Sequence, residues 1–194
     1  MKKLLILFIL LFITFPLVYA QHITFLGVPL KGNINTFSQK LFKKSYSREN
    51  KKATNLLGNN KKFFDVPTFG YPATAIVEYD ESTNNVYEAI LMFNLYDFPF
   101  DEFERFVSVF ENQIEEKYNS EVVMTYYEEF GYGTLPGDHW SIYNKDTKIY
   151  IGEIFLYLQI NNFKEETERA DFMLHIMYRN AEAPSFEDQM RDYY

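Results

Sequence analysis

A strongly apolar stretch, residues 4–18, opens the chain directly behind Lys2 and Lys3. A charged start, an apolar centre and small residues before a cleavage point form the order of a secretory signal peptide. The stretch is shorter than the roughly 20 residues that span a bilayer. We therefore expect residues 1–20 to be a signal peptide cleaved after Ala20, with an uncleaved N-terminal anchor as the alternative. The folded part is then exported to the periplasm or the cell exterior.

The 174 residues after this stretch contain no cysteine, so neither a disulfide nor a lipid-modified cysteine can hold the folded chain. Stability must come from a hydrophobic core, and the length suits one such core. We expect one domain over residues 21–180 and a loosely held tail over residues 181–194. No second long apolar stretch follows, which predicts no membrane span after signal cleavage.

The mature chain is acidic: without Lys2 and Lys3 it carries 17 Lys and Arg against 27 Asp and Glu, a net charge of −10. This balance argues against nucleic acid as a partner, because phosphate groups repel such a protein. Anionic lipid surfaces repel it too unless it has a segregated basic patch. Only residues 40–62 are rich enough in lysine to form one, and a solvated connector explains the same residues.

Aromatic residues make up 19% of the chain, with 16 Tyr, 20 Phe and one Trp. This exceeds what a core alone usually takes, so we expect some of them at the surface. Tyrosine has an apolar body and a polar tip, which makes a tyrosine-rich surface stable in water and suited to binding.

Two helices are predicted. Asn33 is a good N-cap for residues 34–44, where Ile34, Phe37 and Leu41 recur at helical spacing. A second helix begins between residues 97 and 101. Its buried stripe is expected to comprise Phe103, Val107, Phe110, Ile114 and Tyr118.

The strands are predicted from alternation and turn residues. Residues 73–79 and 86–96 flank a turn-forming cluster and should form a hairpin. On its second strand, the face with Leu91 and Phe93 is the better core face. The remaining predicted strands are a short one at 22–26, a minor one near 54–57, then 122–130, 139–143 paired with 149–160, and 172–179. The tail is either loosely held or a short docking helix that uses Phe186 and Met190.

The fold class predicted from this order is α+β, with two helices packed in two layers on a mainly antiparallel sheet. Each predicted helix is followed by a hairpin, which suggests a weak internal duplication. The segment from His22 to Gly32, followed by Phe37 and Leu41, resembles the start of a group of uncharacterised small exported proteins of gut Gram-negative bacteria. That resemblance implies an exported α+β domain and no activity. The doubled arrangement is also similar in fold to secreted β-lactamase-inhibitor proteins, which implies no function.

The most distinctive loop is residues 131–140, in which three glycines precede Asp138, His139 and Trp140. Asp138 and His139 could act as a general base, but neighbours on a strand point to opposite faces. Tyr132 and Trp140 could form a stacking platform for a sugar or peptide. The alternative is that the same residues form a connecting loop without a binding or catalytic role.

Other constellations are too incomplete to predict chemistry. The three histidines are far apart in sequence, and no zinc motif accompanies them. Asp80, Ser82 and Asn84 start like a calcium loop but lack its later ligands, and a hairpin turn explains them. Glycosidase chemistry needs two acids that face each other across a cleft at a set separation. The sequence does not show that separation for paired acids such as Glu128-Glu129 and Glu165-Glu166. We expect no metal, no cofactor and no catalytic residue.

The best hypothesis from the sequence is a non-enzymatic module that binds a protein, peptide or glycan. Its predicted binding residues are Tyr126, Tyr127, Tyr132, Trp140, Tyr150 and Tyr157. One alternative is a hydrolase of an envelope or dietary polymer, which a cleft with two acids of perturbed pKa would favour. Another is a structural component of an envelope assembly, which an extended apolar face without a cavity would favour.

Overall fold

The computed structural model describes residues 22–45, 47–57, 59–125 and 135–184. The helices are α2 (Ile34–Ser45), α3 (Lys51–Leu57) and α4 (Phe100–Lys117). The strands are β1 (Thr24–Phe25), β2 (Val28–Pro29), β3 (Arg48–Glu49), β4 (Lys61–Thr68), β5 (Tyr71–Tyr79), β6 (Val86–Pro99), β7 (Asn119–Thr125), β8 (Leu135–Tyr143), β9 (Tyr150–Lys164) and β10 (Arg169–Asn180). The predicted α+β class with a mainly antiparallel sheet is confirmed.

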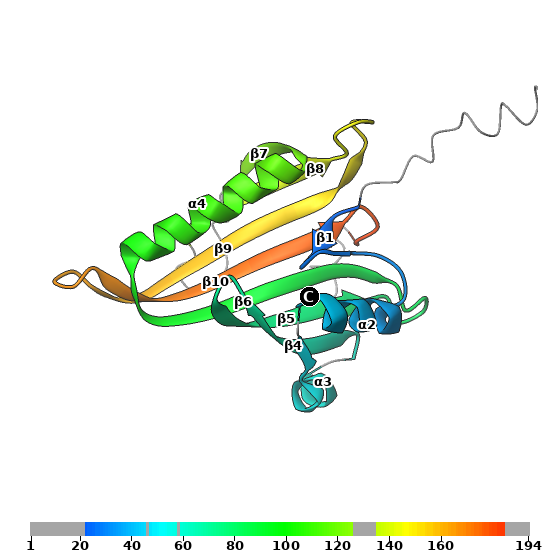
Figure 1. Ribbon diagram of the computed structural model, residues 1–194, viewed down its shortest axis with the longest axis horizontal. Coiled ribbons are helices and arrows are strands. Elements are labelled where there is room, and N and C mark those ends of the chain that lie inside the picture. The colour runs from blue at the N-terminus through cyan, green and yellow to red at the C-terminus, as the bar shows by residue number, and fades with distance from the viewer. Residues whose placement is uncertain (1–21, 46, 58, 126–134, 185–194) are drawn as a thin grey trace, which may run out of the picture.

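Eight strands form one sheet in the order β3-β4-β5-β6-β10-β9-β8-β7, and every neighbouring pair is antiparallel. The two long strands β6 and β10, far apart in sequence, lie side by side at the centre (Figure 1). β1 and β2 form a separate short hairpin before α2. Short turns join β4 to β5, β5 to β6, β8 to β9 and β9 to β10. Helix α3 lies between β3 and β4, and α4 connects β6 to the outer strand β7.

Helix α2 begins where the sequence predicts. The Oδ1 atom of Asn33 accepts a hydrogen bond of 2.9 Å from the backbone N–H of Asn35, which satisfies one of the free donors at a helix start. Ile34, Phe37 and Leu41 are buried. The predicted helix over residues 34–44 and its apolar stripe are therefore confirmed.

Helix α4 follows Pro99, which suits the start of a helix because it has no backbone N–H to leave unpaired. The ring of Phe103 stacks on Phe172 of β10 with centroids 4.2 Å apart. Further along the helix, Phe110 contacts Trp140 of β8 edge-on at 6.2 Å. These contacts bury the stripe that the helical periodicity predicted, except that Val107 is only half-buried.

Both long helices contact the same face of the sheet. Strand register aligns Ala75, Leu91, Ile176 and Leu156 in one row across four strands, and all four are buried. Phe42 of α2 packs edge-on against Phe64 of β4 at 5.7 Å on this same side. We call this side, which contacts α2 and α4, the helix face. The opposite side is called the far face.

The segment before α2 belongs to the core. Phe25 packs edge-on against Tyr178 at 5.3 Å, and the Tyr118 hydroxyl accepts a hydrogen bond of 3.0 Å from the backbone N–H of Thr24. The side-chain amide of Asn180 donates to the carbonyl oxygens of Leu30 (2.9 Å) and Val86 (3.1 Å). The folded unit therefore begins within a few residues of the expected cleavage point.

The minor strand predicted near residues 54–57 is wrong, because these residues end helix α3. Asn50 caps that helix: its Oδ1 atom accepts a hydrogen bond from the Ala53 N–H, and its carbonyl accepts one from the Thr54 N–H. Strand β4 was not predicted. The predicted strands at 73–79, 86–96, 139–143 and 172–179 are confirmed and extend further, and the strand predicted at 149–160 is confirmed as 150–164. Residues 126–130 of the predicted strand 122–130 lie outside the described residues.

The structure describes the predicted tail, residues 181–194, only up to Pro184. The Ala181 N–H donates to the carbonyl of Ile151, and the Arg179 side chain donates to the carbonyl of Pro184. Phe186 and Met190 lie outside the described residues. Within the described part of the chain, no helix has both the length and the apolar character that a bilayer crossing requires.

Candidate functional site: the far face of the sheet

Antiparallel pairing aligns the far-face residues in rows that run across the strands. The charged row comprises Lys61, Glu78, Glu88, Arg179 and Glu153. The apolar row comprises Phe63, Ile76, Ile90, Met177, Phe155 and His139. The mixed row comprises Arg48, Asp65, Thr74, Met92, His175 and Tyr157. Beyond it, Asn94, Met173 and Gln159 are aligned in the same way.

In the charged row, two acids share one arginine. The Arg179 Nε lies 3.0 Å from the Glu88 Oε2, and its Nη1 lies 3.7 Å from the Glu153 Oε2. Burial raises the pKa of Glu88 to about 7, and the nearby Glu78 charge acts in the same direction. The hydrogen bond with His139 holds the pKa of Glu153 below its ordinary value. The environment thus drives the pKa values of these two carboxyls apart.

A pair of acids with separated pKa values is the arrangement that acid–base catalysis needs. A catalytic acid must also touch its substrate, however, and Glu88 is only 3% exposed. Buried ion-pair networks perturb pKa values in the same way without any catalytic role. The charged row therefore fits a buried structural network better than a catalytic pair.

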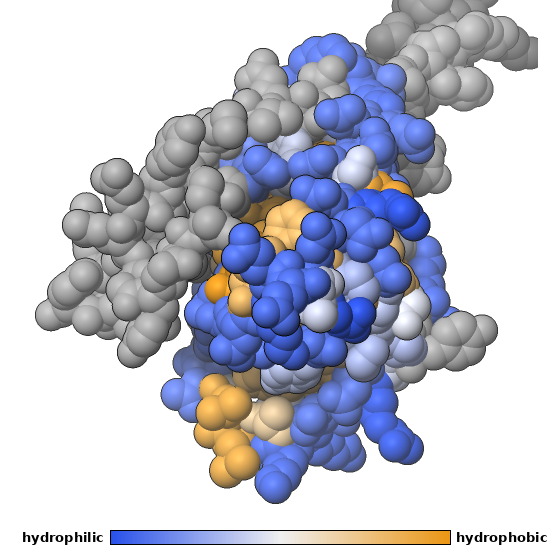
Figure 2. All heavy atoms as spheres, turned by 90° about the vertical axis from the view of Figure 1, so that its left-hand side faces the viewer, coloured by the Kyte–Doolittle hydropathy of each residue, from blue (hydrophilic) through white to orange (hydrophobic). Residues whose placement is uncertain are grey.

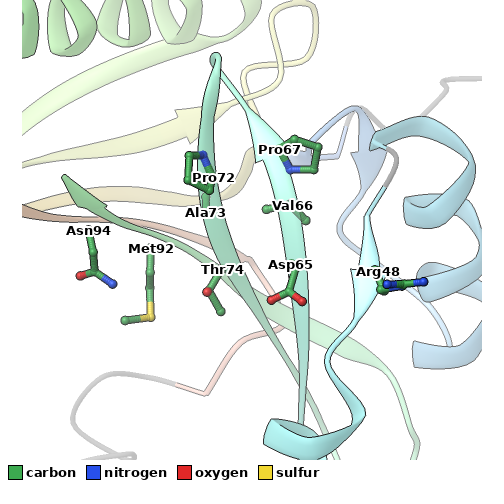
Figure 3. Close-up of a pocket in the computed structure, with 9 residues that line it drawn as sticks. All are labelled: Arg48, Asp65, Val66, Pro67, Pro72, Ala73, Thr74, Met92 and Asn94. Carbon is green, nitrogen blue, oxygen red and sulfur yellow. The ribbon is translucent and has the colours of Figure 1, made fainter. Parts of the chain in front are cut away.

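A groove of about 620 Å³ lies on the far face over β3, β4, β5 and β6. Its lining comprises Arg48, Asp65, Val66, Pro67, Pro72, Ala73, Thr74, Met92 and Asn94. Figure 3 shows Asp65, Thr74 and Met92 side by side on three neighbouring strands, as the mixed row requires. The groove thus offers a carboxylate, a hydroxyl, an amide and a thioether in one shallow hollow.

Next to the groove, the centre of the far face is lined by half-buried Met92, Met173, Met177 and His175. His175 is directly opposite Met92 in the β6–β10 pairing. Burial lowers the pKa of His175, so its imidazole is neutral at pH 7. Among the described residues its Nε2 atom has no hydrogen-bond partner. These four residues, which we call the strip, therefore present soft, adaptable side chains around one unsatisfied ring nitrogen.

An aromatic ladder borders the strip on β8 and β9. The His139 ring stacks on Phe155 at 4.1 Å, and the Phe155 and Tyr157 rings lie nearly parallel with centroids 5.9 Å apart. At the other end of β9, Tyr150 packs edge-on against Tyr143 and hydrogen-bonds to Glu153, and burial raises its pKa. The ladder and Tyr150 extend the aromatic surface along β9.

Two of the six predicted binding residues, Tyr150 and Tyr157, lie on the far face at separate positions along β9. Trp140 lies in the core at 2% exposure, against Phe110, so the predicted indole platform does not form at the surface. The physical reason is its strand parity, which places the large ring on the helix face. Tyr126, Tyr127 and Tyr132 lie outside the described residues.

The loop pair Asp138 and His139 does not converge on one point. Asp138 hydrogen-bonds to Glu111 of α4, while His139 lies against Phe155 on the far face. In the Asp80 turn, the carboxylate accepts hydrogen bonds from the Ser82 hydroxyl (2.6 Å) and the Thr83 N–H (2.7 Å), as a hairpin turn requires. Nowhere in the described ranges do three His, Asp or Glu side chains gather as metal ligands.

Sequence reasoning missed the methionines and His175 because tyrosine content directed attention to aromatic residues. The signal that could have found them is the alternation on β6, where Ile90, Met92 and Asn94 occupy the face opposite the core. No family model, curated protein or solved structure matches this chain.

Proposed function

We propose that the protein is a non-enzymatic binding module that holds a protein or peptide on the far face of its sheet. The observation that carries this proposal is the composition of that face. An antiparallel sheet covered on one side usually exposes polar residues on the other. Here the apolar row and the mixed row present phenylalanine, isoleucine, methionine, histidine and tyrosine, most of them half-buried, and the remaining polar side chains are confined to Arg48, Asp65 and Thr74.

The chemistry of the face favours a peptide-like ligand. Methionine side chains adapt to irregular apolar partners, and the groove beside them supplies acceptors at Asp65 and Asn94 for backbone or side-chain N–H groups. A sugar would need an open aromatic ring face. Phe155 is buried between His139 and Tyr157, which leaves little free ring for a glycan.

The architecture supports a continuous binding face. We interpret the fold as two layers, with α2 and α4 on one side of the sheet. Apart from helix α3, which lies between β3 and β4, the order α2-β3-β4-β5-β6 is repeated as α4-β7-β8-β9-β10, and the last strands of the two halves pair at the centre. This order is what an internal duplication would produce, and it makes the far face one surface across both halves.

Two other functions fit the same contacts less well. Glu88 and Glu153 are the one observation that favours a hydrolase, and the burial of Glu88 speaks against it. A purely structural role would need an extended apolar face without a hollow, whereas the far face carries the groove. Export remains part of the proposal and places the ligand outside the cytoplasm.

A crosslinking pull-down tests the binding function. Residues 21–194 are used as bait against the envelope and secreted fractions of the organism that encodes the chain. Met92→Glu places a charge in the middle of the far face, and Val109→Glu places one on the exposed side of α4 as the matched control. One stoichiometric protein or peptide that is retained by Val109→Glu and lost by Met92→Glu would support the proposal. Equal capture by both variants, or no capture, would contradict it.

A further inference from the structure

The charges of the mature chain are strongly segregated along the sequence. Residues 40–62 contain eight Lys or Arg and one acid, a net charge of +7. Residues 63–194 contain eight Lys or Arg against 26 acids, a net charge of −18. A region so different from the rest of an acidic protein suggests a partner of opposite charge.

The fold gathers the basic region at one edge of the molecule. It spans the end of α2, strand β3, helix α3 and the start of β4, and β3 is the edge strand of the sheet. Among the described residues, no ion pair involves the basic side chains of Lys40, Lys43, Arg48, Lys51 and Lys52. All five are exposed. Their charge is therefore available to a partner.

Helix α3 adds an apolar tip to this region. None of its residues is buried, and its last two, Leu56 and Leu57, are 72% and 68% exposed. In Figure 1 the helix projects beyond β4 at the lower end of the molecule, and Figure 2 shows a hydrophobic protrusion at that same end with hydrophilic atoms beside it. Packing in the core therefore does not explain these two adjacent leucines on a protruding helix end.

We propose that helix α3 docks on the surface of an anionic phospholipid membrane. Leu56 and Leu57 enter the boundary between headgroups and acyl chains, while the exposed lysines and Arg48 lie against the lipid phosphates. A short segment with an aliphatic tip and basic flanks has the chemistry of an interfacial anchor. Each basic side chain near an anionic surface strengthens binding about fivefold.

An acidic protein is the alternative partner, and its carboxylates would pair with the lysines. It would not explain the two protruding leucines, which need a deep apolar medium or a matching pocket. The acidic remainder of the chain does not prevent docking. Except for Asp65 on β4, which pairs with Arg48 in the strand register, its acids lie on other elements, and fields between exposed charges fade over about 8 Å at physiological salt. The protrusion of α3 beyond β4 holds the rest of the molecule back from the surface.

Vesicle binding by residues 21–194 tests the proposal. Every residue of the hydrophobic core lies between Ile23 and Ile176, so this chain keeps the described fold and lacks the apolar N-terminal stretch. Vesicles of phosphatidylcholine alone are compared with vesicles containing about one third phosphatidylglycerol. We expect at least tenfold stronger binding to the anionic vesicles, reduced at high salt. Equal binding to both vesicles, or binding to neither, would overturn the proposal.

Paired variants separate the two contributions. Lys51→Glu with Lys52→Glu should weaken binding to anionic vesicles by at least about thirtyfold, and Leu56→Ser with Leu57→Ser by about tenfold or more. The control is Arg105→Glu with Val109→Ser, which removes an exposed basic and apolar pair from α4. A comparable loss in this control would contradict docking through α3. Unchanged thermal unfolding would show that all three variants fold.

The absence of cysteine allows a direct measure of insertion. A single cysteine introduced as Leu57→Cys and labelled with an environment-sensitive fluorophore should shift its emission to the blue on anionic vesicles. The same label at Val109→Cys should not shift. A blue shift at position 109 alone, or at neither position, would overturn the placement of α3 in the membrane.

Discussion

The Nε atom of Arg179 on β10 lies 3.0 Å from the Oε2 atom of Glu88 on β6, and both side chains are almost completely buried. The pair joins β6 and β10, the two central strands of the sheet. The two charged groups are buried together, because the free-energy cost of burying an isolated charge is far larger than that of burying a paired one. Burial nevertheless outweighs this contact in setting the pKa of Glu88, and that makes stability depend on pH.

The first prediction concerns Glu88, whose pKa burial raises from the ordinary 4.5 to about 7. Between these values the folded protein holds a proton that the unfolded chain releases, so stability falls as pH rises. Glu88→Gln removes this decline. Relative to the variant, the wild type should lose about 3 kcal/mol of unfolding free energy between pH 4.5 and pH 8, measured by urea denaturation.

Glu153→Gln is the control with the opposite sign. The pKa of Glu153 is lowered, so its contribution to stability is present above the ordinary pKa and disappears as pH falls. Its removal should therefore make the decline of stability with rising pH steeper. Parallel pH curves for the wild type and Glu88→Gln would contradict a buried, protonated Glu88.

A second prediction rests on Gly152 in the β9–β10 pairing. A Cβ atom there would lie 2.0 Å from the Arg179 carbonyl oxygen, and the backbone φ of +142° is one that other residues rarely adopt. Gly152→Ala should cost about 3 kcal/mol or prevent folding. The control, Gly32→Ala, has a φ of +73° but meets no atom within 4 Å, and should cost about 1 kcal/mol. Equal melting temperatures for the two variants would show that the collision does not exist.

A third prediction tests how the N-terminal segment is attached. Asn180→Leu removes the two hydrogen bonds to the carbonyl oxygens of Leu30 and Val86 and leaves both buried. It should cost about 3 kcal/mol of unfolding free energy. Asn112→Leu removes a hydrogen bond on an exposed helix surface and should change stability by less than about 0.5 kcal/mol. A stable Asn180→Leu variant with native protease resistance of residues 22–32 would refute this role.

Much of the fold could be predicted because its long elements carry clear periodicity. Phe103, Phe110 and Ile114 repeat at helical spacing, and Leu91 and Phe93 alternate with the far-face residues. These patterns arise from one-sided burial, which a sequence records directly. Strand β4 was missed because Pro67 interrupts its pattern, yet Pro67 faces Pro72 near the end of the β4–β5 hairpin. The hairpin turn itself lies just beyond these prolines.

The far face could not be predicted in the same way. Its rows depend on the pairing of β6 with β10, whose paired residues are separated by about half the chain and carry no local signal of register. His175 and Met92 become neighbours only through that pairing. Helix α3 begins with the capping hydrogen bonds of Asn50, which lies in a polar, lysine-rich stretch that indicates a connector when read alone. Trp140 was assigned to the surface because the loop around it, rather than its strand parity, was considered.

Photo-crosslinking tests binding on the far face most directly. A photoreactive phenylalanine analogue is placed at Tyr157 on the far face and, in a separate variant, at Val109 on the exposed side of α4. Both are irradiated in the envelope and secreted fractions. If the far face binds a protein or peptide, position 157 should yield one discrete crosslinked species and position 109 none. The same species from both positions, or crosslinking from position 109 alone, would contradict binding on the far face.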